Sequence, residues 1–399
     1  MINEATIAFI RQHADADIRQ LALQGTKDPE VDLPFVLDQI AGRQTARYKL
    51  PSWAAKEGII YPPHLSMEQC SSELTACYKA ELTNEGRLLV DLTGGFGVDF
   101  SFMARSFSKA VYVEQQEHLC DIARQNFNLL GLQQAEVVCG NGEEYLKTME
   151  PADLIYIDPA RRDDHGERTY AIGDCTPDVL SLRDQLLSKA SRVLLKLSPM
   201  LDWRKALCDL GTDIVSEVHI VSVGNECKEL LIMAESKKKL GNIPVHCINL
   251  HANGSRQQFT FHQMPPSDNP PSTFCLSSFT RYIYEPNASI MKAGCFAALS
   301  QRFGIGQLAQ NSHLLASEVL VANFPGRVFQ LDAVTSMNKR ELRQHLQGLT
   351  QANITVRNFP LTVAELRRRL KLSEGGSTYI FATTLASGDR VLLICRKVD

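Results

Sequence analysis

The sequence has no long apolar run and no cysteine pattern of the kind that binds zinc. None of its stretches approaches the roughly 18 consecutive apolar residues that a membrane-spanning helix needs. Its N-terminus opens with acidic and polar residues where a signal peptide would have a basic segment and then an apolar one. The 11 cysteines form no CxxC pair, which is typical of reduced thiols in the cytosol. We therefore expect a cytoplasmic protein without a signal peptide or membrane segment.

The sequence also has little net charge. Its 42 Lys and Arg against 45 Asp and Glu give a charge of -3, which argues against a histone-like binder of polyanions. That sum hides two opposite parts: from Gln330 onward 11 basic and 6 acidic residues give +5, and the remainder carries -8. A basic tail on an acidic body fits a module that positions nucleic acid, although its Arg367–Arg369 run also suits a solvated helix face.

The 399 residues predict two or three domains, at roughly 150 residues each. Apolar residues at about helical spacing predict helices up to residue 85, interrupted by a proline-marked extended stretch at 50–63. A helix is expected over 71–81, with Ser71 or Ser72 as its cap.

From residue 87 the pattern changes to short apolar runs that alternate with helical segments. This alternation predicts an α/β fold with a parallel, doubly wound sheet and right-handed crossovers. The short link at 224–228 predicts an antiparallel hairpin that closes the edge of the sheet. The apolar runs are 88–92, 110–114, 135–139, 153–158, 192–197, 214–223 and 229–235.

The second half of the chain is expected to contain two further elements and a separate tail module. Strands are expected around 245–250 and 258–262, followed by helical residues 281–325 with Pro286 in a first helical turn. The tail predicts a β-α-β-α-β-β module with helices over 339–349 and 363–370. Two pairs there have capping-box spacing, Asn338 with Glu341 and Thr362 with Glu365. We place the segment boundaries at 1–85, 86–240, 241–328 and 329–399.

The most informative cluster is VDLTGGFGVDF at 90–100, where the first strand of the sheet ends. Asp91 ends the strand, and Gly94, Gly95 and Gly97 form a turn into a helix, where glycine lets the backbone approach a ligand closely. A dinucleotide loop would place Phe100 where a small residue is needed for helix–strand packing. A tight turn without a ligand is the alternative.

The loop DxTGGxG resembles motif I of class I S-adenosylmethionine (SAM)-dependent methyltransferases. The chain as a whole is similar to a group of bacterial methyltransferases with an N-terminal helical region, a ferredoxin-like insert and a THUMP-like C-terminal domain. Further stretches that carry the resemblance are QIAGRQTARYKLPSW (39–53), EQCSSELTACYKA (68–80), GNECKEL (224–230), YEPNASIMKAG (284–294) and RNFPLTVAELRRRLKL (357–372).

This resemblance implies a Rossmann-like methyltransferase sheet, SAM as the cofactor and, by analogy with THUMP domains, an RNA substrate. The four segments are then an N-terminal helical region, a SAM-binding methyltransferase domain, a connecting ferredoxin-like region and a THUMP-like α+β domain.

The resemblance also implies roles for residues at the strand ends. Glu114 would accept hydrogen bonds from the ribose hydroxyls, and Asn141 would offer its amide oxygen to the adenine amino group. Asp158 starts the motif IV position beside the transferable methyl group. A surface glutamate, a turn asparagine and an ordinary Asp-Pro turn are the alternatives. The expected SAM-binding residues are Asp91, Thr93, Gly94, Gly95, Gly97, Glu114, Asn141 and Asp158.

Methyl transfer depends mainly on in-line alignment, which is worth roughly 7–11 kcal/mol. Asp158 and Arg161 are the expected catalytic residues. Asp158 would orient an attacking nitrogen and take up its proton. Arg161 would hold a phosphate or a base carbonyl, unless it pairs with an aspartate at 163 or 164. Ala160 and Arg161, not an aromatic, directly follow Pro159, and no thiol lies in the stretch 196–199, so flipped-base stacking and C5 chemistry are not expected at this site.

Four residues are expected to contact the substrate: Gln69, Ser71, Lys196 and Ser198. Gln69 and Ser71 belong to a segment that resembles an element closing over the cofactor, with a simple helix cap as the alternative. No histidine spacing indicates a metal site. The leading hypothesis is a SAM-dependent methyltransferase that acts on a base nitrogen of RNA. A small-molecule or protein methyltransferase and a non-catalytic SAM- or RNA-binding protein are the alternatives, and the oligomeric state is left open.

Overall fold

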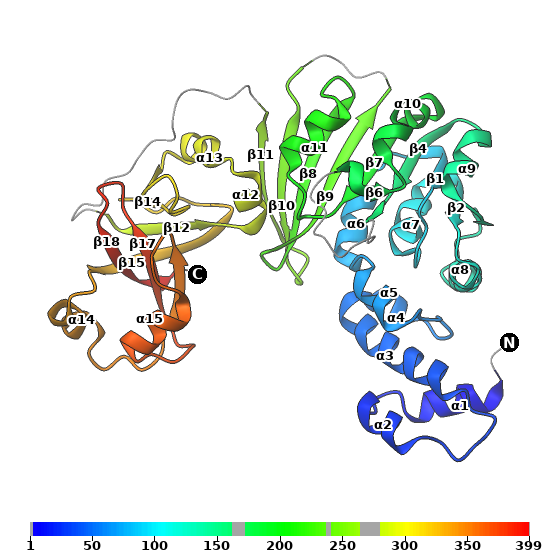
Figure 1. The fold of residues 1–399 in the computed structure, drawn as a ribbon, viewed down its shortest axis with the longest axis horizontal. Coiled ribbons are helices and arrows are strands. Elements are labelled where there is room, and N and C mark those ends of the chain that lie inside the picture. Colours follow the sequence, from blue (N-terminus) through cyan, green and yellow to red (C-terminus); the bar gives the residue numbers. More distant parts are fainter. Residues whose placement is uncertain (1–2, 162–171, 237–240, 264–279, 399) are drawn as a thin grey trace. The chain divides into compact units, whose positions relative to one another are not determined.

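The structure, a computed structural model, describes residues 3–161, 172–236, 241–263 and 280–398 (Figure 1). It divides into two compact units, one formed by 1–218 with 228–243 and the other by 219–227 with 244–399. This division differs from the four expected segments, because the N-terminal helices share a unit with the methyltransferase-like sheet. Among the described residues, no helix combines the length and apolar character needed to cross a membrane.

The N-terminal part of the first unit is helical, as expected. Asn3, Asp17 and Asp32 cap three of the helices by accepting a backbone N–H at the first turn. The expected extended stretch at 50–63 contains one short helix, α4, because Pro51 fits the first turn of a helix. The helices are α1 (Glu4–Gln12), α2 (Ile18–Gln24), α3 (Leu33–Lys49), α4 (Pro51–Ala54), α5 (His64–Gln69) and α6 (Glu73–Glu81).

A nine-stranded sheet has the order β11-β10-β8-β9-β7-β4-β1-β2-β3. The central strands pair in parallel, as predicted, and β9 lies antiparallel to β7. The β8–β9 hairpin does not close the edge, because β10 and β11 continue the sheet beyond β8. The strands are β1 (Gly86–Asp91), β2 (Phe107–Glu114), β3 (Ala135–Cys139), β4 (Ala152–Ile157), β7 (Ala190–Leu197), β8 (Val215–Val223), β9 (Glu226–Glu235), β10 (Pro244–Leu250) and β11 (Arg256–His262).

Helices follow the parallel strands, and their apolar sides complete the core of the first unit. Phe100 of α7 and Phe127 of α8 pack with Tyr112 of β2, with ring centroids 5.0–5.6 Å apart. The elements between the strands are α7 (Val98–Met103), η1 (Ala104–Ser106), α8 (Glu117–Leu129), α9 (Gly142–Thr148), β5 (Ala160–Arg161), η2 (Ile172–Asp174), β6 (Cys175–Thr176), α10 (Val179–Lys189) and α11 (Trp203–Leu210).

The N-terminal helices and the glycine-rich loop share one apolar core. Trp53 of α4 packs edge-on against Phe96 of the loop, with ring centroids 5.0 Å apart, and both are buried. The buried Asn126 of α8 accepts from the Ile60 N–H at 2.9 Å and donates to the Ile60 carbonyl at 2.8 Å. The helical region therefore positions the loop directly.

The second unit contains a seven-stranded sheet with the order β13-β14-β12-β15-β18-β17-β16. Residues 281–325 are not helical throughout: Pro286 ends strand β12, and Asn287 caps the helix that follows. The elements of this part are β12 (Tyr282–Pro286), α12 (Ala288–Ala293), α13 (Phe296–Phe303), β13 (Gly306–Gln307), β14 (Leu315–Ser317) and β15 (Gly326–Thr335).

The tail has the predicted β-α-β-α-β-β order. Helices α14 and α15 share one apolar cluster with β16, β17 and β18. Thr362 and Glu365 form the expected capping box, but Glu341 accepts from Ser336 instead of from Asn338. The elements are β15, α14 (Lys339–Leu346), β16 (Asn353–Arg357), α15 (Val363–Leu370), β17 (Thr378–Thr384) and β18 (Arg390–Lys397).

Candidate active site

The glycine-rich loop turns tightly between β1 and α7. Gly95 and Gly97 have φ angles of +58° and +80°, which favour glycine. A Cβ at Gly94 would lie 2.3 Å from the Tyr112 ring, so no larger residue fits there. At Gly95, in contrast, the nearest atom to such a Cβ would be 3.7 Å away. The loop is thus packed against β2 at Gly94, with room beside its backbone at Gly95.

Glu114, at the end of β2, holds this loop in place. Its Oε2 accepts the Gly95 N–H at 2.8 Å, and its Oε1 accepts the Gln116 N–H at 2.8 Å. Each carboxylate oxygen retains a second lone pair, so these bonds are compatible with further donors such as ribose hydroxyls.

Asp91 and Thr93 connect the loop to the next strand. The buried Asp91 accepts the Thr93 N–H at 2.9 Å, and the Thr93 hydroxyl oxygen accepts the Asp158 N–H at 2.7 Å. Thr93 therefore fixes the position at which Asp158 leaves β4. Desolvation raises the pKa of Asp91 well above its usual range, and the nearby carboxylates of Asp99 and Asp158 add to this effect.

Asp158 forms an ion pair with Lys196, which comes from the adjacent strand β7. Desolvation raises the pKa of Asp158, and the Lys196 ammonium opposes that rise. Burial alone would lower the pKa of Lys196, but the carboxylates of Asp158 and Asp99 outweigh it and raise this pKa. We conclude that Lys196 is protonated. Its charge favours the ionised form of Asp158, whose side chain is 37% exposed.

A buried cluster of charges lies beneath this pair. The Lys79 Nζ of α6 has no exposed surface and lies 3.1 Å from Asp99 Oδ1 and 2.6 Å from Glu229 Oε2. Ser71 donates to Asp99 at 2.8 Å, and the Tyr156 hydroxyl donates to the same carboxylate at 2.7 Å. Burial would raise the pKa of Asp99, but Lys79 and Lys196 outweigh it and lower that pKa. The cluster joins the N-terminal helices to the strands that carry the site.

The structure gives two of the expected site residues other partners. Ser71 is 7% exposed and belongs to the buried cluster, so its side chain does not face an open surface. The Asn141 amide oxygen caps α9 by accepting the N–H groups of Glu143 and Glu144 at 2.8 and 3.1 Å. Its amide nitrogen, and not its oxygen, is therefore the group that Asn141 would present to adenine.

The remaining expected residues are only partly placed. Ser72, not Ser71, caps α6. Gln69 is exposed at the end of α5, and Ser198 follows β7, where its hydroxyl oxygen accepts the Met200 N–H at 3.3 Å. The backbone of Arg161 belongs to β5, but its side chain and the aspartates at 163 and 164 lie outside the described residues.

Sequence reasoning did not single out Lys79, Asp99 or Glu229. Lys79 stands near the end of a short helix, a position typical of surface lysines, and its partner Glu229 lies 150 positions away in the sequence. One signal was available for Asp99, because it follows the glycine loop at the start of α7. The pairing itself has no local pattern.

The carboxylates at the strand ends suit a cofactor that carries a positive charge and ribose hydroxyls. Besides desolvation, the carboxylates of Asp99, Asp158 and Glu114 raise the pKa of Asp91, and a positive charge bound beside them would oppose that rise. The free space beside Gly95 and the carboxylate of Glu114 allow a hydroxyl-bearing ligand to approach the loop.

Two family models match the second half of the chain. The "ferredoxin-like domain" model covers residues 282–325, and the "THUMP domain-like" model covers residues 326–397. Together they account for the seven-stranded sheet, whose strands run from 282 to 397.

Known structures and proteins resemble the chain to very different extents. The crystal structure of a "putative methyltransferase" from Porphyromonas gingivalis W83 is 34% identical, covers 99% of this chain and 98% of that one, and has a TM-score of 0.84. A protein-L-isoaspartate O-methyltransferase from Thermotoga maritima is 29% identical over 77 residues, which is 18% of this chain and 24% of that protein. A tRNA m1G37 methyltransferase structure from M. jannaschii is 13% identical over 43% of this chain and 51% of that one, with a TM-score of 0.31.

Proposed function

The chain belongs to the same methyltransferase family as the Porphyromonas gingivalis protein, and from this premise we propose that it transfers a methyl group from SAM to a base nitrogen of RNA. The observation that carries the proposal is the placement of Asp158. Its backbone is fixed to the glycine loop through Thr93, and its carboxylate is paired with Lys196 at the ends of β4 and β7. Ligands of open α/β sheets bind at such strand ends.

The cofactor would be held by residues that the structure brings together around the loop. Glu114 would accept hydrogen bonds from the ribose hydroxyls, the backbone at Gly95 would lie beside the ligand, and Asn141 would donate from its amide nitrogen. When bound, SAM supplies an electrophilic methyl group on a positively charged sulfur. The carboxylate of Asp158 would stabilise that charge, and Asp91 would hold the loop through the Thr93 N–H.

Asp158 would act on the attacking nucleophile. An ionised carboxylate accepts a hydrogen bond from a ring or exocyclic N–H, which orients the nitrogen lone pair and gives its proton an acceptor. Desolvation raises the pKa of Asp158 and so makes it a better acceptor, while the Lys196 ammonium favours its ionised form. Arg161, which follows two residues later, is proposed to bind a phosphate or a base carbonyl.

The RNA would be positioned by the basic surface of the tail module. On α14 and at the end of α15, basic side chains are exposed and form no salt bridge with any described residue. Such charges bind a polyanion without the cost of breaking an existing pair. These residues are Lys339, Arg340, Arg343, Arg368, Arg369 and Lys371.

Two measurements on the purified protein test the proposal. Titration calorimetry with SAM and S-adenosylhomocysteine should give one binding site, and no heat with either compound would contradict every SAM-dependent function. Transfer of labelled methyl from SAM should then be assayed on total RNA, on RNase-treated RNA and on total protein. Label in RNA that RNase removes supports the proposal. Label in protein alone would indicate a protein methyltransferase.

A further inference from the structure

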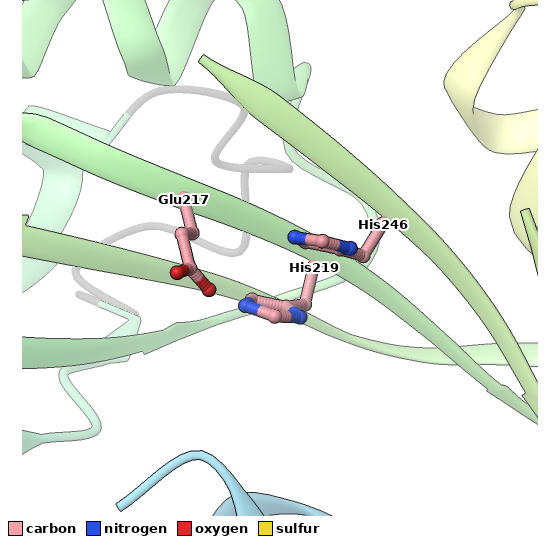
Figure 2. A group of neighbouring side chains, drawn as sticks. All are labelled: Glu217, His219 and His246. Atoms are coloured by element: carbon pink, nitrogen blue, oxygen red, sulfur yellow. The ribbon is translucent and has the colours of Figure 1, made fainter. Parts of the chain in front are cut away.

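Three side chains that commonly bind metals come together on β8 and β10, and the proposed function makes no use of them. They are Glu217, His219 and His246, each of which offers one ligand atom. Figure 2 shows the Glu217 carboxylate beside the two imidazole rings. This cluster is distinct from the strand-end residues around Asp158.

Strand geometry explains why two of these residues face the same way. Side chains alternate along a β-strand, so Glu217 and His219 lie on one face of β8, while Val218 between them faces the other side and is fully buried. His219 is itself only 3% exposed.

The distances place the three ligand atoms close to coordination range. All lie within 4.8 Å of one another. Zinc lies about 2.0–2.2 Å from imidazole nitrogen and carboxylate oxygen, so two atoms on one ion are at most roughly 4.2 Å apart. The His219 and His246 rings are stacked, with centroids 4.6 Å apart and planes 16° apart. Small side-chain rotations would bring the nitrogens onto a shared ion.

The environment of His246 has a feature of metal-binding histidines. Its Nδ1 lies 2.9 Å from the hydroxyl oxygen of Thr260 on β11. A hydrogen bond at one ring nitrogen fixes the tautomer and the ring orientation, and so directs the other nitrogen, here Nε2, toward a metal. Thr260 would thus be the outer partner of this ligand.

We propose that Glu217, His219 and His246 bind one divalent first-row transition metal ion, with Zn²⁺ as the representative. Two imidazole nitrogens and one carboxylate oxygen form a donor set that favours such ions over Mg²⁺ or Ca²⁺, which prefer oxygen ligands throughout. Three protein ligands leave a coordination position for water.

The test uses the full-length protein after removal of metals with a chelator, and ZnCl2 as the probe. Calorimetry and elemental analysis should show one Zn²⁺ per chain. H246A and E217Q should abolish this site, and T260V, which removes only the outer partner, should weaken Zn²⁺ binding by about 10–100-fold. H262A is the matched control, because His262 is an exposed histidine on the same hairpin, and it should bind Zn²⁺ like the wild type.

Zn²⁺ could also bind to cysteine thiolates of the chain. The absorption spectrum of bound Co²⁺ distinguishes thiolate ligands from the proposed histidine and glutamate ligands. The proposed site predicts Co²⁺ absorption without sulfur-to-metal charge-transfer bands, whereas thiolate ligands produce them. Because E217Q and T260V alter partly or fully exposed side chains, they test the site even if a His219 variant does not fold. No stoichiometric Zn²⁺ binding by the wild type, or unchanged binding by both H246A and E217Q, would overturn the proposal.

Discussion

The lysines of the candidate site and the arginines at the end of α15 are arranged in opposite ways. In the first unit, Lys79 and Lys196 are 0% and 14% exposed, and each lies against carboxylates. In the second unit, Arg368 and Arg369 are exposed and form no salt bridge among the described residues. Buried pairs fix the position and protonation of their members, whereas exposed charges remain available to a ligand. The buried lysines are therefore suited to fixing the groups around them, and the exposed arginines to contacting an anionic ligand.

The largest expected effect is the loss of methyl transfer when Asp158 is replaced, which tests whether the paired site carries out the reaction. D158N removes the proton acceptor while keeping the size of the side chain. We expect methyl transfer to fall by about 10²–10⁴-fold, the usual contribution of a general base. D202N is the matched control, because Asn caps α11 as well as the Asp202 it replaces. Equal activity of D158N and D202N would exclude Asp158 from the reaction.

K79M tests whether the buried cluster depends on its cation. Removal of Lys79 takes away the ammonium paired with the buried Glu229 and leaves Asp99 with Lys196 alone. We expect the free energy of unfolding to fall by about 3–5 kcal/mol. K147A, which removes an exposed pair with Glu144, should cost less than about 1 kcal/mol. Both are measured by urea unfolding followed by circular dichroism. A K79M loss no larger than that of K147A would show that the cluster does not stabilise the fold as a set of paired charges.

Neutralising two exposed arginines of α15 tests whether this helix binds RNA. R368Q/R369Q should weaken RNA binding and lower the slope of log K against log salt by roughly 1.5–2, because each phosphate contact contributes nearly one. The control is R396Q, since Arg396 is already paired with Asp332 at 2.8 Å, and its slope should change less. Identical slopes for the double variant and the wild type would contradict docking through α15.

The smallest effect is a shift in pH dependence. Asp158 must be ionised to accept a proton, so activity should decline as the pH falls through its pKa, which desolvation raises and Lys196 lowers. K196M removes the lowering contribution, so the acidic limb of the kcat profile should move to higher pH, while K196R should retain the wild-type position. An unmoved limb in K196M would show that Lys196 does not control the ionisation of Asp158.

The parallel strands and the glycine loop were predictable because both depend on local pattern. Buried parallel strands have apolar runs in the sequence, and Gly94, Gly95 and Gly97 directly after such a run predict a tight turn. The βαβαββ order of the tail followed from the same alternation, helped by the capping box at Thr362.

The sequence could not show which side chains become partners only through folding. Lys79 meets Glu229 across 150 positions, and Ser71 meets the same carboxylate across 158. The helix cap formed by Asn141 is local. An asparagine after a strand, however, is equally compatible with a cap and with a contact to a ligand, so the sequence does not distinguish the two. Glu217 and His219 are two residues apart on one strand, and His246 reaches them only because β10 lies beside β8 in the sheet.

The most direct test of the central claim is a comparison of modified nucleosides, by mass spectrometry, between cells that lack this protein and their parent. We expect that cells lacking the protein lose one nucleoside methylated on a base nitrogen, and that it returns with the wild-type gene but not with D158N. Identical nucleosides in both strains, or rescue by D158N, would show that the protein does not methylate a base nitrogen of RNA through Asp158.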